Sequence, residues 1–492
     1  MSSYINLLPV ILVVLGAMVS IASEPFIKDE NKHKVLPWSA AFFVVMAMAS
    51  CVLLSPDTLF NLFAMDPVRR LLTGAVLLCT LLGISGIQWT LGHEKHKGGE
   101  PYGLMLLATG GALLMIQAID FLALFIAMEL TSFPVYALVG LRRRNTNSCE
   151  GVFKYFVSGA IFSAIFLYGV AMIYGATGTT SFFSSVIYMR EPIYAIGVLM
   201  VLFGVLFKAG AAPVHYWVAD VYTGAAVAVT GFMAAVVKVG ALAALGSIWL
   251  SVLVTKAGTA PAWNLAEPVT INSQSESLGV MIIIIALVSM AIGAFSGLAQ
   301  KSIRRILAFS AVMNAGFILL GVLLPDYIGS GKVEFGPMFY FLITYAVASA
   351  GALTGVAYLA GKDDKNETLD DLQGAGRKRP FVALGVAVCL ASLAGLPPVA
   401  GFLAKFVLFT GAFSAGMTWI AAAGFGLSLV AAAYYLRIAY VLFAPAKKCT
   451  GNCECPCKCA ENAVFGYMLK FTVAVAAVAL VVVGIFPSLV LL

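Results

Sequence analysis

The sequence predicts an all-α membrane protein with about 14 transmembrane helices. Of its 492 residues, 61% are apolar and only 11% are charged, and the mean hydropathy is +0.98. A soluble domain usually carries about 25% charged residues, so a soluble enzyme is excluded, and so is a disordered chain. Apolar stretches long enough to cross a bilayer follow one another along the whole chain, which leaves no room for a large soluble domain.

The chain is expected to form one polytopic membrane domain, residues 1–492. The first apolar stretch lacks a basic segment before it, and Ala22–Pro25 is a poor cleavage site, so it is interpreted as a membrane helix rather than a signal peptide. Pro and Gly at several boundaries support the other limits. The expected helices are 5–23, 38–56, 71–91, 103–119, 121–141, 152–175, 193–212, 224–250, 278–299, 305–324, 336–360, 380–412, 417–443 and 464–491.

Helices 7, 8 and 12 are expected to be broken. Segment 193–212 runs into Pro213, segment 224–250 opens with TGAAVAVTG, and segment 380–412 contains Pro397 and Pro398 near its middle. Proline removes a backbone donor and clashes one turn back. Broken helices at membrane depth occur where the backbone lines a cavity or is buried in protein.

The interruptions fall in corresponding places if the fold contains two five-helix repeats, helices 4–8 (103–250) and helices 9–13 (278–443). An odd repeat length forces opposite orientations, and paired interrupted segments point to a transport site. The alternative is that Gly and Pro are simply common in membrane helices.

Basic residues fall mainly in alternate loops, with a net charge of +7 for the chain. The positive-inside rule places these loops in the cytoplasm and both termini on the outer, periplasmic side. The few basic residues assigned to outer loops are Arg69, Arg70, Arg190, Lys256 and Lys332.

A cysteine-rich loop, 444–463, is predicted on the cytoplasmic side, where thiols stay reduced. Its single-residue spacing is closer to thiolate clusters than to zinc fingers. A soft-metal site, a solvated loop without metal and an electron-carrying cluster remain open. The cysteines are Cys449, Cys453, Cys455, Cys457 and Cys459.

Four ionisable residues interrupt long apolar stretches: Glu129, Lys208, Lys238 and Lys405. A charge at the centre of a membrane helix costs about 2.5–3.5 kcal/mol on insertion scales. One interpretation is a static Glu129–Lys208 ion pair, with the other two lysines snorkelling. The other is a lateral chain of protonatable sites with water between them, which the central position of Lys238 favours.

His215 follows Pro213 at the break in helix 7. It is either a proton relay, given its ordinary pKa of about 6.5, or a structural residue. Tyr136, Tyr216 and Tyr222 are weaker candidates for supporting water chains.

Several runs resemble the antiporter-like membrane subunits of bacterial proton-pumping NADH:quinone oxidoreductase (complex I), most closely the subunit N type. They are AMELTSFPVYALVGLRRRNTNSCEGVFKYFVSGAIFSAIFLYGVAMIYGATGT, FGVLFKAGAAPVHYWVADVYTGAAVAVTGFMAAVVKVG, QKSIRRILAFSAVMN and SLAGLPPVAGFLAKF, within roughly residues 60–445. Met128 before the Glu, Lys405 and the absence of a long lateral helix favour type N over types M and L.

The resemblance implies roles for the buried ionisable residues. Glu129 is similar to the family's modulating Glu, Lys208 to its partner, Lys238 to the central Lys and Lys405 to the terminal Lys of the proton path. NADH, FMN, iron–sulfur clusters and quinone are expected in partner subunits, and no cofactor in this chain. The expected location is the bacterial inner membrane, with other membrane subunits and lipid as partners and no nucleic acid.

Two departures from the family pattern stand out. Asn314 occupies the usual position of a His, and the cysteine-rich loop lies outside the pattern. Alternatives within the superfamily are a subunit of a cation/proton antiporter, an energy-converting hydrogenase or another complex-I-like dehydrogenase. A self-contained solute transporter and a purely structural subunit are the competing classes.

Overall fold

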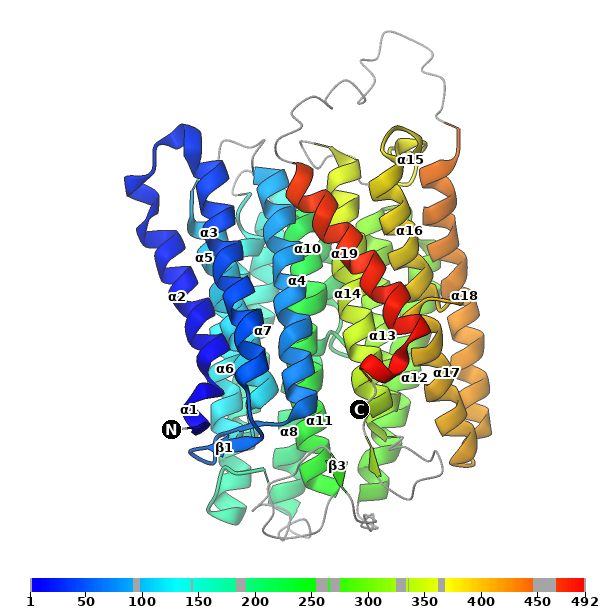
Figure 1. Cartoon of the computed structure of the whole chain (residues 1–492). Helices are drawn as coiled ribbons and strands as arrows, with labels where there is room; N and C mark the ends of the chain where they lie inside the picture. The colour runs from blue at the N-terminus through cyan, green and yellow to red at the C-terminus, as the bar shows by residue number, and fades with distance from the viewer. Residues whose placement is uncertain are drawn as a thin grey trace.

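The computed structural model describes residues 2–91, 98–142, 145–182, 192–253, 264–265, 275–323, 333–334, 336–361, 368–445 and 466–490. Long helices run side by side through the molecule and confirm the all-α prediction (Figure 1).

The bundle consists of helices joined mainly by short connections. The helices are α1 (Ser2–Ile5), α2 (Leu8–Ala22), α3 (Asp29–Ser50), α4 (Pro67–Leu91), α5 (Glu100–Gln117), α6 (Phe121–Val139), α7 (Thr146–Thr177), α8 (Pro192–Ala209), α9 (Trp217–Gly224), α10 (Val227–Phe232), the π-helical turn η4 (Met233–Val237), α11 (Lys238–Leu253), α12 (Ser275–Ala299), α13 (Ile303–Leu323), α14 (Gly336–Ala360), α15 (Ala375–Lys378), α16 (Pro380–Ala394), α17 (Ala400–Ser414), α18 (Thr418–Phe443) and α19 (Gly466–Ile485). Short 3₁₀ turns are η1 (Glu24–Phe26), η2 (Cys51–Leu53) and η7 (Pro487–Leu489).

Strands are confined to two small antiparallel pairs. Strand β1 (Asp57–Leu59) pairs with β2 (Phe63–Met65), and β3 (Asn264–Leu265) pairs with β4 (Val333–Glu334). Both pairs lie at the end of the bundle where the N-terminus is found (Figure 1).

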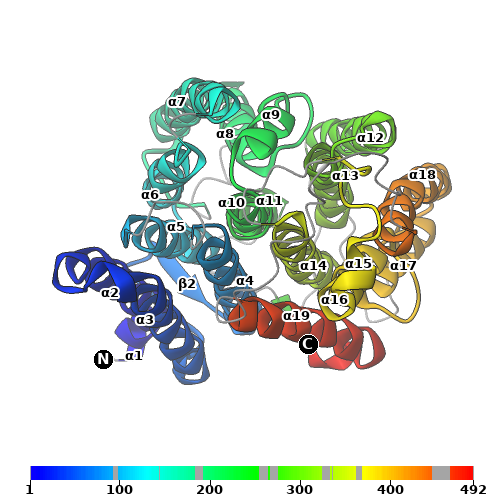
Figure 2. The same ribbon diagram turned by 90° about the horizontal axis from the view of Figure 1, so that it is seen from above.

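Eleven helices in the described part of the chain are long and apolar enough to cross a membrane. Helices α2 and α5 and the α16–α17 pair lie where the sequence predicts the three further crossings, which stay a prediction. The span Val227–Trp249 is fully buried within the chain, whereas only 33% of the best window in α18 is buried. Figure 2 shows the reason: α10, α11 and α14 stand in the middle, and the other helices surround them.

Helices 7 and 12 of the sequence prediction are broken where prolines were expected to break them. Helix α8 stops at Ala209 and α9 starts at Trp217; α16 stops at Ala394 and α17 starts at Ala400. Gly395, at φ +82°, ends α16 in a left-handed conformation that favours glycine.

Helix 8 has a different interruption from the one expected. The TGAA stretch precedes the helix, because Gly224 ends α9 and Ala226 is the N-cap of α10. From Val227 to Leu253 the chain remains helical, with π geometry only in η4, directly before Lys238. Such π turns inside helices are frequent at functional sites.

The described helices form two sets of five segments. The first is α5, α6, α7, α8–α9 and α10–α11; the second is α12, α13, α14, α16–α17 and α18. The two sets occupy opposite halves of the bundle in Figure 2, and the fourth segment is the broken one in each. Helix α8 starts at the lower end in Figure 1 and α16 at the upper end. These features agree with an inverted repeat over 103–250 and 278–443, which stays a prediction.

Candidate functional site: buried lysines across the bundle

Lys208, Lys238 and Lys405 are all enclosed, with 2%, 1% and 5% of their surfaces exposed. They come from α8, α11 and α17, elements that belong to different halves of the bundle. Snorkelling to the membrane surface is therefore excluded for all three, and the interpretation of Lys238 and Lys405 as snorkelling residues is wrong. Each must find its hydrogen-bond acceptors inside the protein.

Lys208 is held by hydroxyl groups and aromatic faces. Its Nζ donates to Ser132 Oγ at 2.5 Å and to Tyr136 Oη at 3.2 Å, both on α6. The same nitrogen lies 5.4 Å from the ring centre of Tyr136 and 5.9 Å from that of Tyr155. Ring faces attract a desolvated cation, and hydroxyls both accept and donate, so this pocket suits either protonation state of the lysine.

Glu129 lies one turn before Ser132 on α6 and is half-buried. Its carboxylate accepts a hydrogen bond from Ser163 Oγ on α7 at 2.5 Å. Within the described chain, Glu129 and Lys208 make no direct ion pair; Lys208 donates to Ser132, and Glu129 accepts from Ser163. Among the described residues, Lys208 is therefore held by hydroxyl groups rather than by a direct ion pair, and the modulating role of Glu129 stays a prediction.

Lys238 begins α11 directly after the π turn. Its Nζ donates to the backbone carbonyl of Ala311 on α13 at 2.8 Å. Among the described residues no carboxylate pairs with it. A buried ammonium with only one carbonyl acceptor is expensive to keep charged, so this position is suited to gaining and losing a proton.

Lys405 is bound to the end of the other half of its own broken helix. Its Nζ donates to the carbonyls of Leu393 and Ala394 at 2.9 and 3.1 Å, and to Ser428 Oγ on α18 at 3.0 Å. Carbonyls at a helix C-terminus are unpaired and carry partial negative charge. Gly401 permits the close approach of the two halves, since a Cβ there would lie 1.8 Å from the carbonyl oxygen of Ser392.

The surroundings of Lys405 open toward the side of the bundle. It lines a largely apolar cavity of about 550 Å³ between α17 and α18, together with Phe402, Phe406, Phe409 and Phe425. This position at the edge agrees with the prediction that Lys405 is the terminal residue of the line.

A polar cluster that the sequence prediction missed lies between Lys238 and Lys405. Tyr435 of α18 shares a short hydrogen bond with Ser310 of α13, and Asn314 donates to Tyr435 Oη at 3.2 Å. Ser310 and Asn314 flank Ala311, the acceptor for Lys238. Tyr435 lies two turns from Ser428, which binds Lys405. Hydroxyl groups therefore link α13 to α18 in the region where Asn314, in place of the histidine usual in the family, cannot titrate.

Comparison with known proteins decides the family. The family model for the transmembrane region of NADH:quinone oxidoreductase and Mrp antiporter subunits matches residues 118–431. The chain belongs to this family. The matched region contains Glu129, Lys208, Lys238 and Lys405, and both broken helices.

Relatives within the family are similar over most of the chain. NADH-quinone oxidoreductase subunit N of Cupriavidus taiwanensis is 32% identical over 87% of this chain and 83% of its own length. The same subunit of Trichlorobacter lovleyi is 36% identical over 73% and 70%.

Solved structures share the fold. A chain of respiratory complex I from Thermus thermophilus, solved with bound aureothin, has a TM-score of 0.75 at 27% identity and covers 98% of both chains. A chain of the Mrp complex from a Dietzia species has a TM-score of 0.80 at 21% identity, covers 100% of this chain and 95% of its own length, and shows a common fold.

Three buried tyrosine hydroxyls in this family member have no protein partner in the described part of the chain: Tyr155, Tyr222 and Tyr345. Buried polar atoms are nearly always hydrogen-bonded, and water is the usual partner when protein is not. The three hydroxyls therefore mark positions for internal water. Of these, only Tyr222 was named from the sequence; the suggested Tyr216 is 55% exposed.

His215 lies between α8 and α9 and is half-buried, and its Nδ1 has no partner among the described residues. Nearby, Asp220 of α9 is a bridging acid. It binds Lys154 of α7 at 2.6 Å and Arg305 of α13 at 3.5 Å. These ion pairs fasten the short helix α9, so Asp220 has a structural role, while a relay role for His215 stays a prediction.

The five cysteines Cys449, Cys453, Cys455, Cys457 and Cys459 lie outside the described residues, and metal binding there stays a prediction. Within the described ranges, no group of three or more His, Cys, Asp or Glu side chains is placed to hold a metal ion.

Proposed function

We propose that this chain is the subunit N-type, proton-translocating membrane subunit of a respiratory NADH:quinone oxidoreductase. The observation that carries the proposal is the row of three buried lysines held by hydroxyls and carbonyls rather than by acids. An ion pair would keep each lysine charged, whereas neutral acceptors leave both protonation states accessible. The similarity to subunit N over 87% of the chain supports the same assignment.

In this mechanism a change of charge passes along the line. Glu129 biases Lys208 through the α6 turn; Lys208 and Lys238 exchange protons through internal water; and the Ser310–Tyr435 hydroxyls lead toward Lys405. Tyrosine and serine hydroxyls pass protons because each donates and accepts at once. Quinone reduction in partner subunits drives the change, and NADH, FMN, iron–sulfur clusters and quinone are bound there.

The proposed setting is the bacterial inner membrane, with other membrane subunits and lipid as neighbours and no nucleic acid. Both termini face the periplasm. In support, the N-terminus lies at one end of Figure 1, while α15, with Arg377 and Lys378, lies at the opposite end. Basic residues are retained on the cytoplasmic side of a membrane.

A second candidate is a subunit of a cation/proton antiporter, which the common fold with the Mrp chain favours. Isolation of the assembly through a tag on this chain separates the two. The proposal predicts that the purified assembly oxidises NADH with quinone and, in liposomes, acidifies or alkalinises the lumen according to its orientation. An assembly that lacks NADH oxidation and exchanges Na⁺ for H⁺ would instead support the antiporter assignment.

Tyr435→Phe is expected to slow proton pumping roughly fivefold, because it removes one hydrogen-bonding hydroxyl worth about 1 kcal/mol. The measurement is the initial rate of pH change in liposomes per NADH oxidised. Tyr440→Phe on the same helix is the matched control, since Tyr440 is 74% exposed and should have no effect. Equal pumping by both variants would remove Tyr435 from the path.

A further inference from the structure

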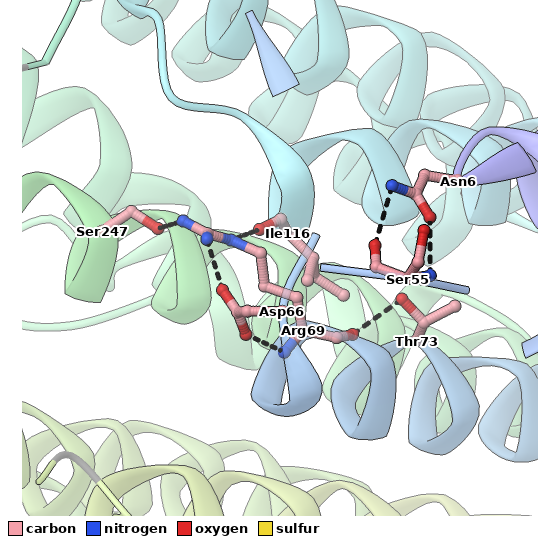
Figure 3. A network of polar contacts seen from close by, with 7 residues as sticks. All are labelled: Asn6, Ser55, Asp66, Arg69, Thr73, Ile116 and Ser247. Atoms are coloured by element: carbon pink, nitrogen blue, oxygen red, sulfur yellow. Dashed lines mark hydrogen bonds and ion pairs between the residues drawn. The ribbon is translucent and has the colours of Figure 1, made fainter. Parts of the chain in front are cut away.

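Helix α4 starts at the lower end of the bundle in Figure 1, and Figure 3 shows the buried ion pair at its start from close by. Arg69 and Asp66 stand at the start of α4, with only 1% and 6% of their surfaces exposed. Arg69 Nη1 donates to Asp66 Oδ2 at 2.5 Å, and the Arg69 backbone N–H donates to Asp66 Oδ1 at 2.8 Å. The sequence had assigned Arg69 to an outer loop; this is wrong, because α4 starts at Pro67 and draws the side chain inward.

The guanidinium group joins three helices. Its Nε donates to the carbonyl of Ile116 in the last turn of α5 at 3.1 Å, and its Nη2 donates to Ser247 Oγ on α11 at 3.3 Å. Ser247 follows Lys238 by nine residues on the same helix, which is about 13 Å of helical rise. The cluster therefore joins α4, α5 and α11 between Lys238 and the end of the bundle that is predicted to face the periplasm.

Stabilisation of the folded protein does not by itself explain why this ion pair is buried. A buried ion pair is often no more stabilising than apolar side chains of the same volume, because both ions lose their hydration. Two further buried donors flank the cluster without a partner in the described chain: Gln117 Nε2, next to Ile116, and Trp249 Nε1, two residues after Ser247. Buried donors without a protein partner usually bind water, so we expect water beside the ion pair at this end of the interior.

We propose that Asp66 and Arg69 form an electrostatic seal. Water held beneath Lys238 would open a path for protons to the outer surface, and a fixed guanidinium across it repels them, as arginines do in water channels. Protons on Lys238 are then directed sideways toward Lys405 rather than outward through the first half of the bundle. The direction of transfer rests on the proposed function, whereas the seal itself does not.

The test is passive proton entry into liposomes that contain the purified assembly, without NADH, under a K⁺ diffusion potential set with valinomycin. The double variant Asp66→Asn/Arg69→Gln removes both charges and keeps the polar shape. It is expected to leak protons roughly tenfold faster than wild type, which corresponds to a barrier lowered by about 1.4 kcal/mol. Its NADH:quinone activity in leaky membranes is expected to stay at the wild-type level.

Asn6→Ala is the matched control. It removes a neutral hydrogen-bonded contact at the same end of the bundle, in which Asn6 Nδ2 donates to the Ser55 carbonyl at 3.0 Å and Ser55 N donates to Asn6 Oδ1 at 3.1 Å. No leak is expected from it, or from Lys238→Met. If the double variant Asp66→Asn/Arg69→Gln does not assemble, Asp66→Asn/Arg69→Met decides through the same assay, since it also removes both charges and keeps an oxygen to accept the backbone N–H of residue 69.

A wild-type leak rate in whichever of these two charge-free double variants assembles overturns the seal. Because the assay needs no turnover, its result is separate from the proposed function. A wild-type assembly that fails to pump contradicts the function and leaves the seal standing. Normal pumping together with a tight double variant contradicts the seal alone.

Discussion

Lys238→Met is expected to abolish coupled proton translocation while the assembly still forms. Methionine keeps the length and most of the volume of lysine in a span that is fully buried, and it removes the only titratable group there. The loss should be on the order of 10²-fold or more, the usual contribution of a positioned proton-transfer group. The measurement is the pH change in liposomes per NADH oxidised.

Lys301→Met is the matched control for this prediction, because Lys301 is exposed before α13 and its backbone carbonyl, which the substitution keeps, accepts a hydrogen bond from Leu369. Lys238→Arg keeps the positive charge but cannot release its proton, since a guanidinium group stays protonated. If proton exchange at this position is required, this variant should lose proton translocation as Lys238→Met does. Normal pumping by Lys238→Met would mean that the lysine is structural and that the line is broken at its centre.

Arg69→Met is expected to destabilise the protein by about 3–5 kcal/mol, the usual cost of leaving one partner of a buried ion pair uncompensated. The carboxylate of Asp66 would lose its ion-pair partner at a site that is 6% exposed. Thermal unfolding of the purified assembly in detergent, with the yield of assembled complex, measures the effect.

The second change Asp66→Asn should restore most of the stability lost in Arg69→Met. It removes the unpaired charge and keeps an oxygen to accept the Arg69-position backbone N–H. Arg70→Met, at the exposed neighbouring residue, is the control and should have little effect. Equal losses in the single and double variants would show that packing, not charge burial, accounts for the cost.

The broken helices were predictable because proline acts locally. Pro213 and the Pro397–Pro398 pair lack a backbone donor and interrupt the helices at those positions, so the breaks after α8 and α16 followed from the sequence. The break expected in helix 8 was misplaced, because a run of Gly and Ala is compatible with both a turn and a helix start. Packing of the central α10–α11 segment decided between them.

The lysines were predictable because a charge inside an apolar membrane helix costs free energy in any packing arrangement, so its position in the sequence is enough to mark it. Their partners were not. Ser310 and Tyr435 are 125 residues apart, and serine and tyrosine are ordinary in membrane helices, so nothing local marks them. Arg69 was misassigned because it lies close to the end of its helix, where a basic residue usually reaches water.

The sequence by itself determined that the chain is a helical membrane protein, where two of its helices break and which three lysines lie buried within apolar helices. These follow from transfer free energies and backbone sterics, which act residue by residue. Only the tertiary structure decided that Lys238 donates to a carbonyl of α13, that Tyr435 joins α13 to α18, and that Arg69 joins α4, α5 and α11. Those contacts join segments distant along the chain, so they depend on how whole helices pack together.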